Sequence, residues 1–262
     1  MIEQSPISFD RVAIEYDRTR WVPQSLIDKF VNKLIQEVPI SRKSRTLEIG
    51  VGTGRLAIPL SRHGYKVLGI DISLPMLMQA KQKLIKETNP LYLLRADAKF
   101  LPIRKKTFDL CLFAHILHLL EGWKAILGNI ELLLDRRNIV NAGLFVKWHE
   151  LEPFRLYWDA IRNGKPDRVG AKNPQEIIRF LQDIKGYHWK QFEFAQSAGT
   201  SSWIDAFGLL KEQIFSSQWR IPNDQHQAAL KLVEEKLEEK KDQIFELEAH
   251  CIIDLFRLEA ED

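Results

Sequence analysis

The sequence predicts an α/β fold: a mostly parallel sheet of seven strands, with helices on both faces and an added helical cap. Short, nearly continuously apolar runs alternate with segments of helical periodicity, as expected for strands that are buried on both faces. Glycines or an aspartate follow the first three runs, at the edge where parallel sheets bind ligands. The predicted strands are 46–49, 66–70, 91–94, 108–113, 139–146, 187–194 and 244–258.

Helical periodicity and capping residues predict the helices between these strands. Apolar residues recur at helical spacing before residue 43, and a helix over 55–63 is expected to end at Gly64. Ser73 is placed to cap the next helix. A further helix is expected over 123–134, and the Asn-Pro-Gln-Glu start at 173–176 predicts a helix that stops at Gly186.

The second half of the chain is predicted to complete the sheet and to cover its open edge. We expect residues 1–147 to form a core with an N-terminal lid, and residues 148–262 to carry helical cap insertions at 148–172 and 196–242. The aromatic side chains of these insertions predict a largely apolar pocket whose ring faces can attract a cation. A hydrophobic seam between helices, or between the subunits of a homodimer, is the alternative explanation of each of these aromatics.

The composition is that of an ordinary globular protein. Of 262 residues, 45% are hydrophobic and 28% are charged. The formal net charge of +3 is too small to indicate nucleic-acid binding, which needs a dense stripe of Lys and Arg. Cys111 and Cys251 lie in apolar runs, which indicates buried thiols in a reduced compartment. With neither a signal-peptide pattern nor a bilayer-spanning apolar run, we expect a cytoplasmic protein.

The most informative local feature is the glycine-rich turn 48–55, Glu-Ile-Gly-Val-Gly-Thr-Gly-Arg, between the first strand and a helix. Glycines let the backbone turn tightly and approach a ligand without a Cβ clash. The dinucleotide fingerprint requires a small residue where this chain has Arg55, and a Walker A loop requires Gly-Lys-Ser or Gly-Lys-Thr. The turn therefore disfavours a dehydrogenase and a nucleoside triphosphatase.

Carboxylates lie at the ends of three successive predicted strands. Asp71 can accept hydrogen bonds from both hydroxyls of a ribose. Alternatively, its negative charge can stabilise the N-terminus of the next helix through the helix dipole. Asp97, followed by Ala98, can accept from the amino group of an adenine. Together with Glu48 they form an acidic rim, which suits a ligand with sulfonium and ammonium groups better than a pyrophosphate.

Five motifs in order resemble those of class I S-adenosylmethionine-dependent methyltransferases, which have a Rossmann-like fold. The final motif is similar to the region after strand four in small-molecule enzymes of the ubiquinone/menaquinone-biosynthesis type. Residues 16–20, Tyr-Asp-Arg-Thr-Arg, resemble a segment that these enzymes fold over the cofactor. The five motifs are 47–55, 69–80, 96–102, 108–110 and 115–123.

The resemblance implies that S-adenosylmethionine is the cofactor and S-adenosylhomocysteine the product. It implies that Asp71 holds the ribose, that Asp97 and Ala98 read the adenine, and that the carbonyl of Ala114 takes the amino group. The cofactor-binding residues implied in this way are Tyr16, Arg20, Glu48, Gly50, Gly52, Gly54, Asp71, Ile72, Asp97, Ala98 and Ala114. The segment 135–138 departs from the Lys-Pro-Gly-Gly turn of many relatives, and the absence of Asn-Pro-Pro-Tyr argues against methylation of adenine or glutamine amino groups.

Methyl transfer requires a base only where the nucleophile must lose a proton. The candidate catalytic residues are His118, His115 and Tyr16, with His149 a weaker one, although packing or capping explains the histidines as well. We predict no metal, because His-x-x-His after a strand is poor metal geometry. The expected acceptor is a small molecule methylated on oxygen, nitrogen or carbon. An RNA methyltransferase and a non-catalytic S-adenosylmethionine-binding protein remain alternatives.

Overall fold

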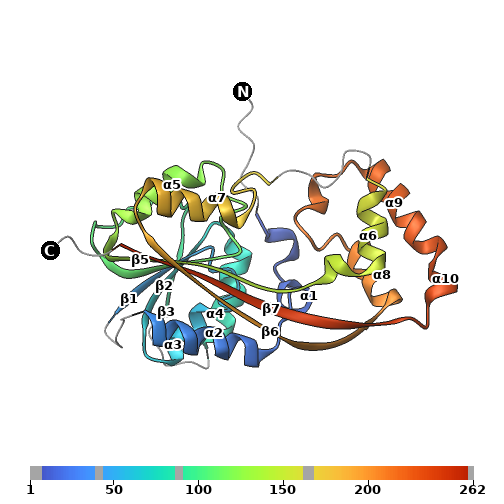
Figure 1. The fold of residues 1–262 in the computed structure, drawn as a ribbon, viewed down its shortest axis with the longest axis horizontal. Coiled ribbons are helices and arrows are strands. Elements are labelled where there is room, and N and C mark those ends of the chain that lie inside the picture. The colour runs from blue at the N-terminus through green and yellow to red at the C-terminus, as the bar shows by residue number, and fades with distance from the viewer. Residues whose placement is uncertain (1–7, 39–43, 86–90, 162–167, 259–262) are drawn as a thin grey trace.

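The computed structural model describes residues 8–38, 44–85, 91–161 and 168–258. Its strands form one seven-stranded sheet of order β3-β2-β1-β4-β5-β7-β6, in which only β7 runs antiparallel to its neighbours. The predicted fold class is therefore confirmed (Figure 1). The strands are β1 (Arg45–Ile49), β2 (Lys66–Asp71), β3 (Leu91–Arg95), β4 (Phe108–Ala114), β5 (Leu134–Val146), β6 (His188–Ser202) and β7 (Ile244–Arg257).

The sheet is apolar on both faces because alternate side chains of each central strand enter different cores. On β4, Leu110 and Leu112 pack into one hydrophobic cluster, and Cys111 and Phe113 pack into the other. All four side chains are fully buried. Figure 1 shows α5 (Trp123–Glu131) and α7 (Pro174–Arg179) on one face of the sheet, opposite α2 (Gln24–Glu37), α3 (Ala57–Arg62) and α4 (Leu74–Leu84).

The helices begin where the capping residues predict. Ser73 accepts the backbone N–H of Met76 at the start of α4, at 3.2 Å. Asn173 accepts that of Glu176 at the start of α7, at 3.0 Å. After α7 the chain continues as a π-helix over Phe180–Ile184, a local widening that helical periodicity alone does not predict. The remaining helices are α1 (Tyr16–Thr19), α6 (Glu152–Asp159), α8 (Trp203–Lys211), α9 (Asn223–Glu235), α10 (Leu237–Lys240) and 3-10 helices at Asp10–Val12, Trp148–Glu150 and Gln218–Arg220.

Strand β6 is longer than predicted and shows that the expectation of a helical insertion starting at residue 196 was wrong. It continues to Ser202, which pairs with Ile244 at the start of β7. The register of β6 with β7 shifts between Ser197 and Thr200, where Gly199 has a φ of +84°. This bulge interrupts the alternation of apolar and polar residues by which a strand is recognised in a sequence. The ends of β6 and β7 form a two-stranded ribbon, which leads to the helical lobe made of α6, α8, α9 and α10 (Figure 1).

Strand β5 also differs from the prediction. It begins at Leu134, and its register with β4 shifts between Phe108 and Leu110, so the segment 135–138 belongs to the strand rather than to a turn. Helix α5 accordingly ends at Glu131. No helix in the described parts of the chain combines the length and the apolar character needed to cross a bilayer.

Candidate functional site

The glycine-rich turn joins β1 to α3 in a conformation that requires glycine. Gly50 and Gly52 have φ values of +71° and +54°, in the left-handed region. The backbone N–H of Gly50 donates to the carbonyl of Ile70 at 2.8 Å, which fixes the turn against β2. A Cβ on Gly50 would lie 2.8 Å from Cγ1 of Ile116, so no larger residue fits without displacing that side chain.

The two aspartates at the strand ends face this turn. One Asp71 oxygen accepts the backbone N–H of Gly52 at 2.8 Å, and the other accepts that of Ser73 at 2.9 Å. Burial raises the pKa of Asp71, although these backbone donors oppose the shift. Asp97 is held by the backbone N–H of Lys99, at 2.8 Å from Oδ1. Both carboxylates are thus fixed in position and keep lone pairs for a ligand.

A cavity at this edge of the sheet brings most of the predicted cofactor residues together. Phe9, Met76, Ile116 and Leu120, which sequence reasoning missed, complete it with apolar surface. Met76, Ile116 and Leu120 lie within the motifs 69–80 and 115–123, but the motifs alone do not show which of their apolar side chains face the cavity, and Phe9 lies outside every motif. The predicted residues that line the cavity are Tyr16, Gly50, Gly52, Asp71, Ile72, Asp97, Ala98 and Ala114.

Glu48 lies in a recess beside this cavity, with Gly52, Arg55 and Ala114. Its side chain is buried, and its Oε2 atom has no hydrogen-bond partner among the described residues. Burial, followed by the nearby charge of Asp71, raises the pKa of Glu48 to about 8. A buried carboxyl with an unpartnered oxygen is suited to receive a cationic group.

Besides Glu48, two predicted cofactor residues do not line the main cavity. Gly54, at φ +79°, packs against α3, where an added Cβ would lie 2.9 Å from Cδ1 of Ile58. Arg20 points into a neighbouring cavity, described below. The structure therefore gives Gly54 a role in the turn and separates Arg20 from the residues around Asp71.

The N-terminal segment closes over the glycine turn through polar contacts. Asp17 accepts a hydrogen bond from Oγ1 of Thr53 at 2.6 Å and forms an ion pair with Lys83. Asp10 accepts a hydrogen bond from Oγ of Ser73. Neither aspartate was singled out in the sequence, because their partners lie far along the chain.

Comparison with known proteins identifies the family. The chain is 30% identical to an uncharacterised protein of Methanocaldococcus jannaschii, over 67% of this chain and 79% of that one. It is also 30% identical to the ubiquinone/menaquinone biosynthesis C-methyltransferase of Syntrophotalea carbinolica, but there it spans only 46% of that protein and 40% of its own length. Residues 47–138 match the model of a methyltransferase domain family.

The chain belongs to the class I S-adenosylmethionine-dependent methyltransferases. The fold agrees: the crystal structure of the YcgJ protein from Bacillus subtilis superimposes with a TM-score of 0.59 at 13% identity, over 91% of this methyltransferase and 100% of that chain.

The cavity of this methyltransferase fits the cofactor of its family. The unpartnered oxygen of Glu48 suits the ammonium of the methionine part, and the free lone pairs of Asp71 suit the ribose hydroxyls. Asp97 and Ala98 line the same cavity. Bound there, S-adenosylmethionine would supply an electrophilic methyl group.

A second cavity, of about 240 Å³, adjoins the first and shares Phe9, Tyr16, His115 and Leu119 with it. Trp148 and Phe215, from the predicted insertions, line the second cavity, whereas Phe154 and Trp203 are buried in the hydrophobic core. The cavity also holds Arg20, Arg55, Arg168 and Arg220. The expectation of a largely apolar pocket did not include these four guanidinium groups. The helical lobe contributes residues 215–217 and Arg220 to the wall.

His115 is bound to the backbone of β5. Its Nε2 lies 2.8 Å from the carbonyl oxygen and 2.5 Å from the amide nitrogen of Leu144, so it extends the pairing of β4 with β5 past Ala114. Burial, followed by the nearby guanidinium of Arg55, lowers the pKa of His115 to about 4. A neutral, hydrogen-bonded imidazole is a weak base. The geometry therefore favours His118, which lines the second cavity.

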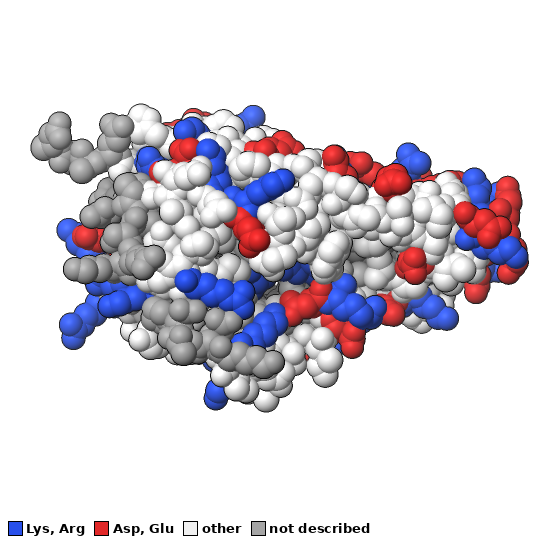
Figure 2. All heavy atoms as spheres, turned by 90° about the horizontal axis from the view of Figure 1, so that it is seen from below, with Lys and Arg blue, Asp and Glu red and all other residues white. Residues whose placement is uncertain are grey.

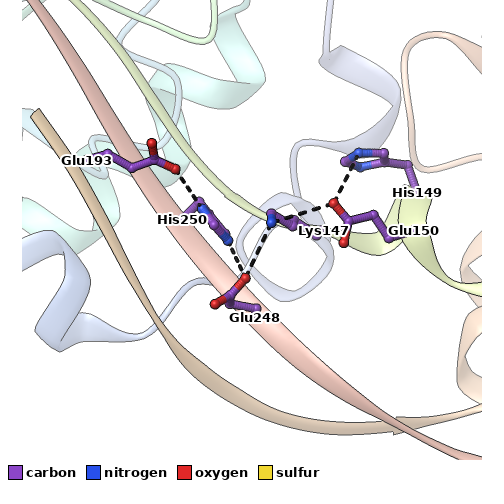
Figure 3. A network of polar contacts seen from close by, with 6 residues as sticks. All are labelled: Lys147, His149, Glu150, Glu193, Glu248 and His250. Atoms are coloured by element: carbon purple, nitrogen blue, oxygen red, sulfur yellow. Dashed lines mark hydrogen bonds and ion pairs between the residues drawn. The ribbon is translucent and has the colours of Figure 1, made fainter. Parts of the chain in front are cut away.

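A polar network lies behind Phe145, one of the residues that line the second cavity (Figure 3). His250 lies between Glu248, at 2.6 Å from Nε2, and Glu193, at 3.2 Å from Nδ1. Its ring stacks on Phe145 with a centroid distance of 5.9 Å, and Phe145 lines the cavity. His149 belongs to the outer part of this network and does not line the cavity. Among the described residues no group of three metal-ligating side chains gathers, and the absence of a metal stays a prediction.

Proposed function

We propose that this protein transfers a methyl group from S-adenosylmethionine to a small-molecule acceptor bound in the second cavity. The observation that carries the proposal is the junction of the two cavities at Tyr16 and His115. A methyl group presented from the first cavity would meet an acceptor held in the second. Close, in-line approach of the two reacting atoms is the main requirement of this reaction.

The residues of the chain then have distinct tasks. Asp71, Asp97 and Glu48 hold the cofactor by its ribose, adenine and ammonium groups. Phe9 and Tyr16 cover the junction and exclude water from it. If the acceptor is a hydroxyl or an amine, His118 takes its proton as the new bond to the methyl carbon forms and the bond from that carbon to sulfur breaks. A carbon nucleophile such as an enolate would not need this base for attack.

One face of the protein favours a small-molecule acceptor over RNA. On the face shown in Figure 2, basic and acidic side chains are interspersed over the described residues, without the continuous basic stripe that tracks a nucleic-acid backbone. The tip around α10 carries both charges side by side. A cytoplasmic location and a homodimer belong to the same proposal and stay predictions.

Replacing Asp71 with alanine is expected to weaken S-adenosylhomocysteine binding by about 10- to 100-fold, because hydrogen bonds to a charged group contribute about 1.5–3 kcal/mol. Isothermal titration calorimetry measures the effect, and Asp224→Ala, on the exposed start of α9, is the control. Equal affinity in both variants, or no binding by the parent protein, would contradict the proposed cofactor site.

Transfer itself is tested with S-adenosylmethionine carrying a labelled methyl group, incubated with small-molecule and RNA fractions of a cell extract. Label in the small-molecule fraction supports the proposal. Label in RNA supports an RNA methyltransferase, and no transfer to either fraction supports a non-catalytic binding protein.

Replacing His118 with asparagine is expected to lower kcat by about 100-fold for an acceptor that must lose a proton, since general-base catalysis contributes about 10²–10⁴-fold. Affinity for S-adenosylhomocysteine should stay unchanged, because His118 does not line the first cavity. Steady-state kinetics with the labelled cofactor provide the measurement. An unaltered kcat would remove His118 from the mechanism.

A further inference from the structure

The second cavity carries a concentration of positive charge. Arg20, Arg55, Arg168 and Arg220 line it, and none of its described lining residues is an aspartate or a glutamate. The guanidinium groups of Arg55, Arg20 and Arg168 are all close enough to the His115 ring to lower its pKa. The cavity is therefore a region of positive potential next to the reacting centre.

Arg20 and Arg55 are half-buried, whereas Arg168 and Arg220 are exposed. The Nη2 atom of Arg20 donates to the carbonyl of Ile214 at 2.6 Å, whereas its Nη1 atom is buried without a hydrogen-bond partner among the described residues. Burial, together with the neighbouring charge of Arg55, lowers the pKa of Arg20 to about 10. A buried guanidinium with an unused donor and no described carboxylate within ion-pair distance is costly unless a ligand supplies the missing acceptor.

The aromatic walls are already engaged by these cations. The guanidinium of Arg20 lies 4.5 Å from the ring centre of Phe215 and 5.9 Å from that of Tyr16. Arg55 lies 5.5 Å from the Tyr16 ring. The ring faces therefore attract the protein's own guanidinium groups, which removes the main reason to expect a cationic acceptor.

The cofactor cannot neutralise all four arginines. S-adenosylmethionine carries one carboxylate, and Arg55 is placed for it because it also lines the recess that contains Glu48. Arg20, Arg168 and Arg220 line neither that recess nor the main cofactor cavity. The positive charges of Arg20 and Arg168 therefore face the space left for the acceptor.

We propose that the acceptor is an acidic small molecule, with an apolar or aromatic body and a carboxylate or phosphate group that Arg20 binds. Arg168 and Arg220 would attract the same group from the rim, where both are exposed. The aromatic side chains, among them Phe145, Trp148 and Phe215, enclose the body of the molecule. This inference rests on the proposed function, since it assumes that the first cavity holds the cofactor.

The test uses the full chain saturated with S-adenosylhomocysteine, titrated in a calorimeter with benzoate, phenyl phosphate and neutral benzamide. We expect at least one anion to bind about tenfold more tightly than benzamide, because charge-assisted hydrogen bonds to arginine are among the stronger ones. Stronger binding of benzoate indicates a carboxylic acid acceptor, and stronger binding of phenyl phosphate indicates a phosphate ester.

Variants separate the acceptor site from the cofactor site. Arg20→Gln should lower the affinity for the anion by about tenfold or more, while the affinity for S-adenosylhomocysteine stays within about twofold of that of the parent protein. Arg220→Gln, at an exposed position, gives the same comparison if Arg20→Gln does not fold, and Arg104→Gln, outside both cavities, is the control. Loaded protein that prefers neither anion, or an Arg20 variant that loses cofactor affinity equally, overturns the inference. Failure of the parent protein to bind S-adenosylhomocysteine counts instead against the proposed function.

Discussion

Replacing Gly170 with alanine is expected to destabilise the protein by about 3 kcal/mol or more. A Cβ there would lie 2.1 Å from the carbonyl oxygen of Leu117 and 2.8 Å from the carbonyl carbon of His118. Because both neighbours are backbone atoms, the clash cannot be relieved by a side-chain rotation. The backbone hydrogen bond from Gly170 to His118, at 3.0 Å, would have to break.

Thermal unfolding measures this effect, as a fall in Tm of roughly 5–10 °C. Catalysis should fall as well, since the displaced segment carries Arg168 and supports His118. Gly128→Ala is the matched control. Gly128 lies inside α5 with open space around its Cβ position, so alanine should stabilise the helix by about 0.5–1 kcal/mol. Equal Tm changes in the two variants would contradict the packing of residues 168–171 against 117–118.

Binding of S-adenosylhomocysteine is expected to strengthen about tenfold for each pH unit between pH 6 and 7. Glu48 has a pKa of about 8 in the folded protein, so it is mostly protonated in this range and must release a proton to pair with the ligand ammonium. The stability of the ligand-free protein is expected to change with pH in the opposite direction and to fall as the pH rises. Because folding raises the pKa of Glu48, the folded state binds the extra proton, and this contribution to stability is lost as the pH rises towards 8.

Glu48→Gln is expected to remove the pH dependence of S-adenosylhomocysteine affinity. Above pH 8 it should weaken the binding free energy by about 3–5 kcal/mol, since a buried ammonium would lose its charged partner. Calorimetry across this pH range provides the measurement, and proton release in buffers of different ionisation enthalpy checks its origin. Glu131→Gln, at a position that lines neither cavity, should leave the pH dependence of S-adenosylhomocysteine affinity unchanged. A slope that survives in Glu48→Gln would assign the titration to another group.

That most of the predicted cofactor residues line one cavity follows from a simple geometric reason that the sequence contains. Asp71 and Asp97 close neighbouring parallel strands, and a parallel sheet brings such positions to one edge beside the glycine turn. Gly54 shows the limit of motif reasoning. Its left-handed backbone is shared with Gly50 and Gly52, but its orientation towards α3 depends on tertiary packing.

The acceptor half could not be read in the same way. Arg168 and Arg220 fall within the two predicted insertions, but these are separate in the sequence, and both arginines line one cavity only because the two insertions fold over the same edge of the sheet. Arg20 was assigned to the cofactor through its neighbour Tyr16, whereas its side chain crosses to Ile214. Sequence patterns record local periodicity, and these contacts join segments that are distant along the chain.

The pairing of Ser202 with Ile244 has a consequence for how acceptor choice can change. Residues 203–243 leave and re-enter the sheet at directly opposed positions, whose Cα atoms lie about 5 Å apart in any antiparallel pair. The sheet itself therefore does not fix the length of the segment between them. A replacement of different length would still have to keep the contact of Trp219 with Phe9 and the hydrogen bond of Arg20 to the carbonyl of Ile214, because these contacts join the segment to the N-terminal cover of the cofactor cavity.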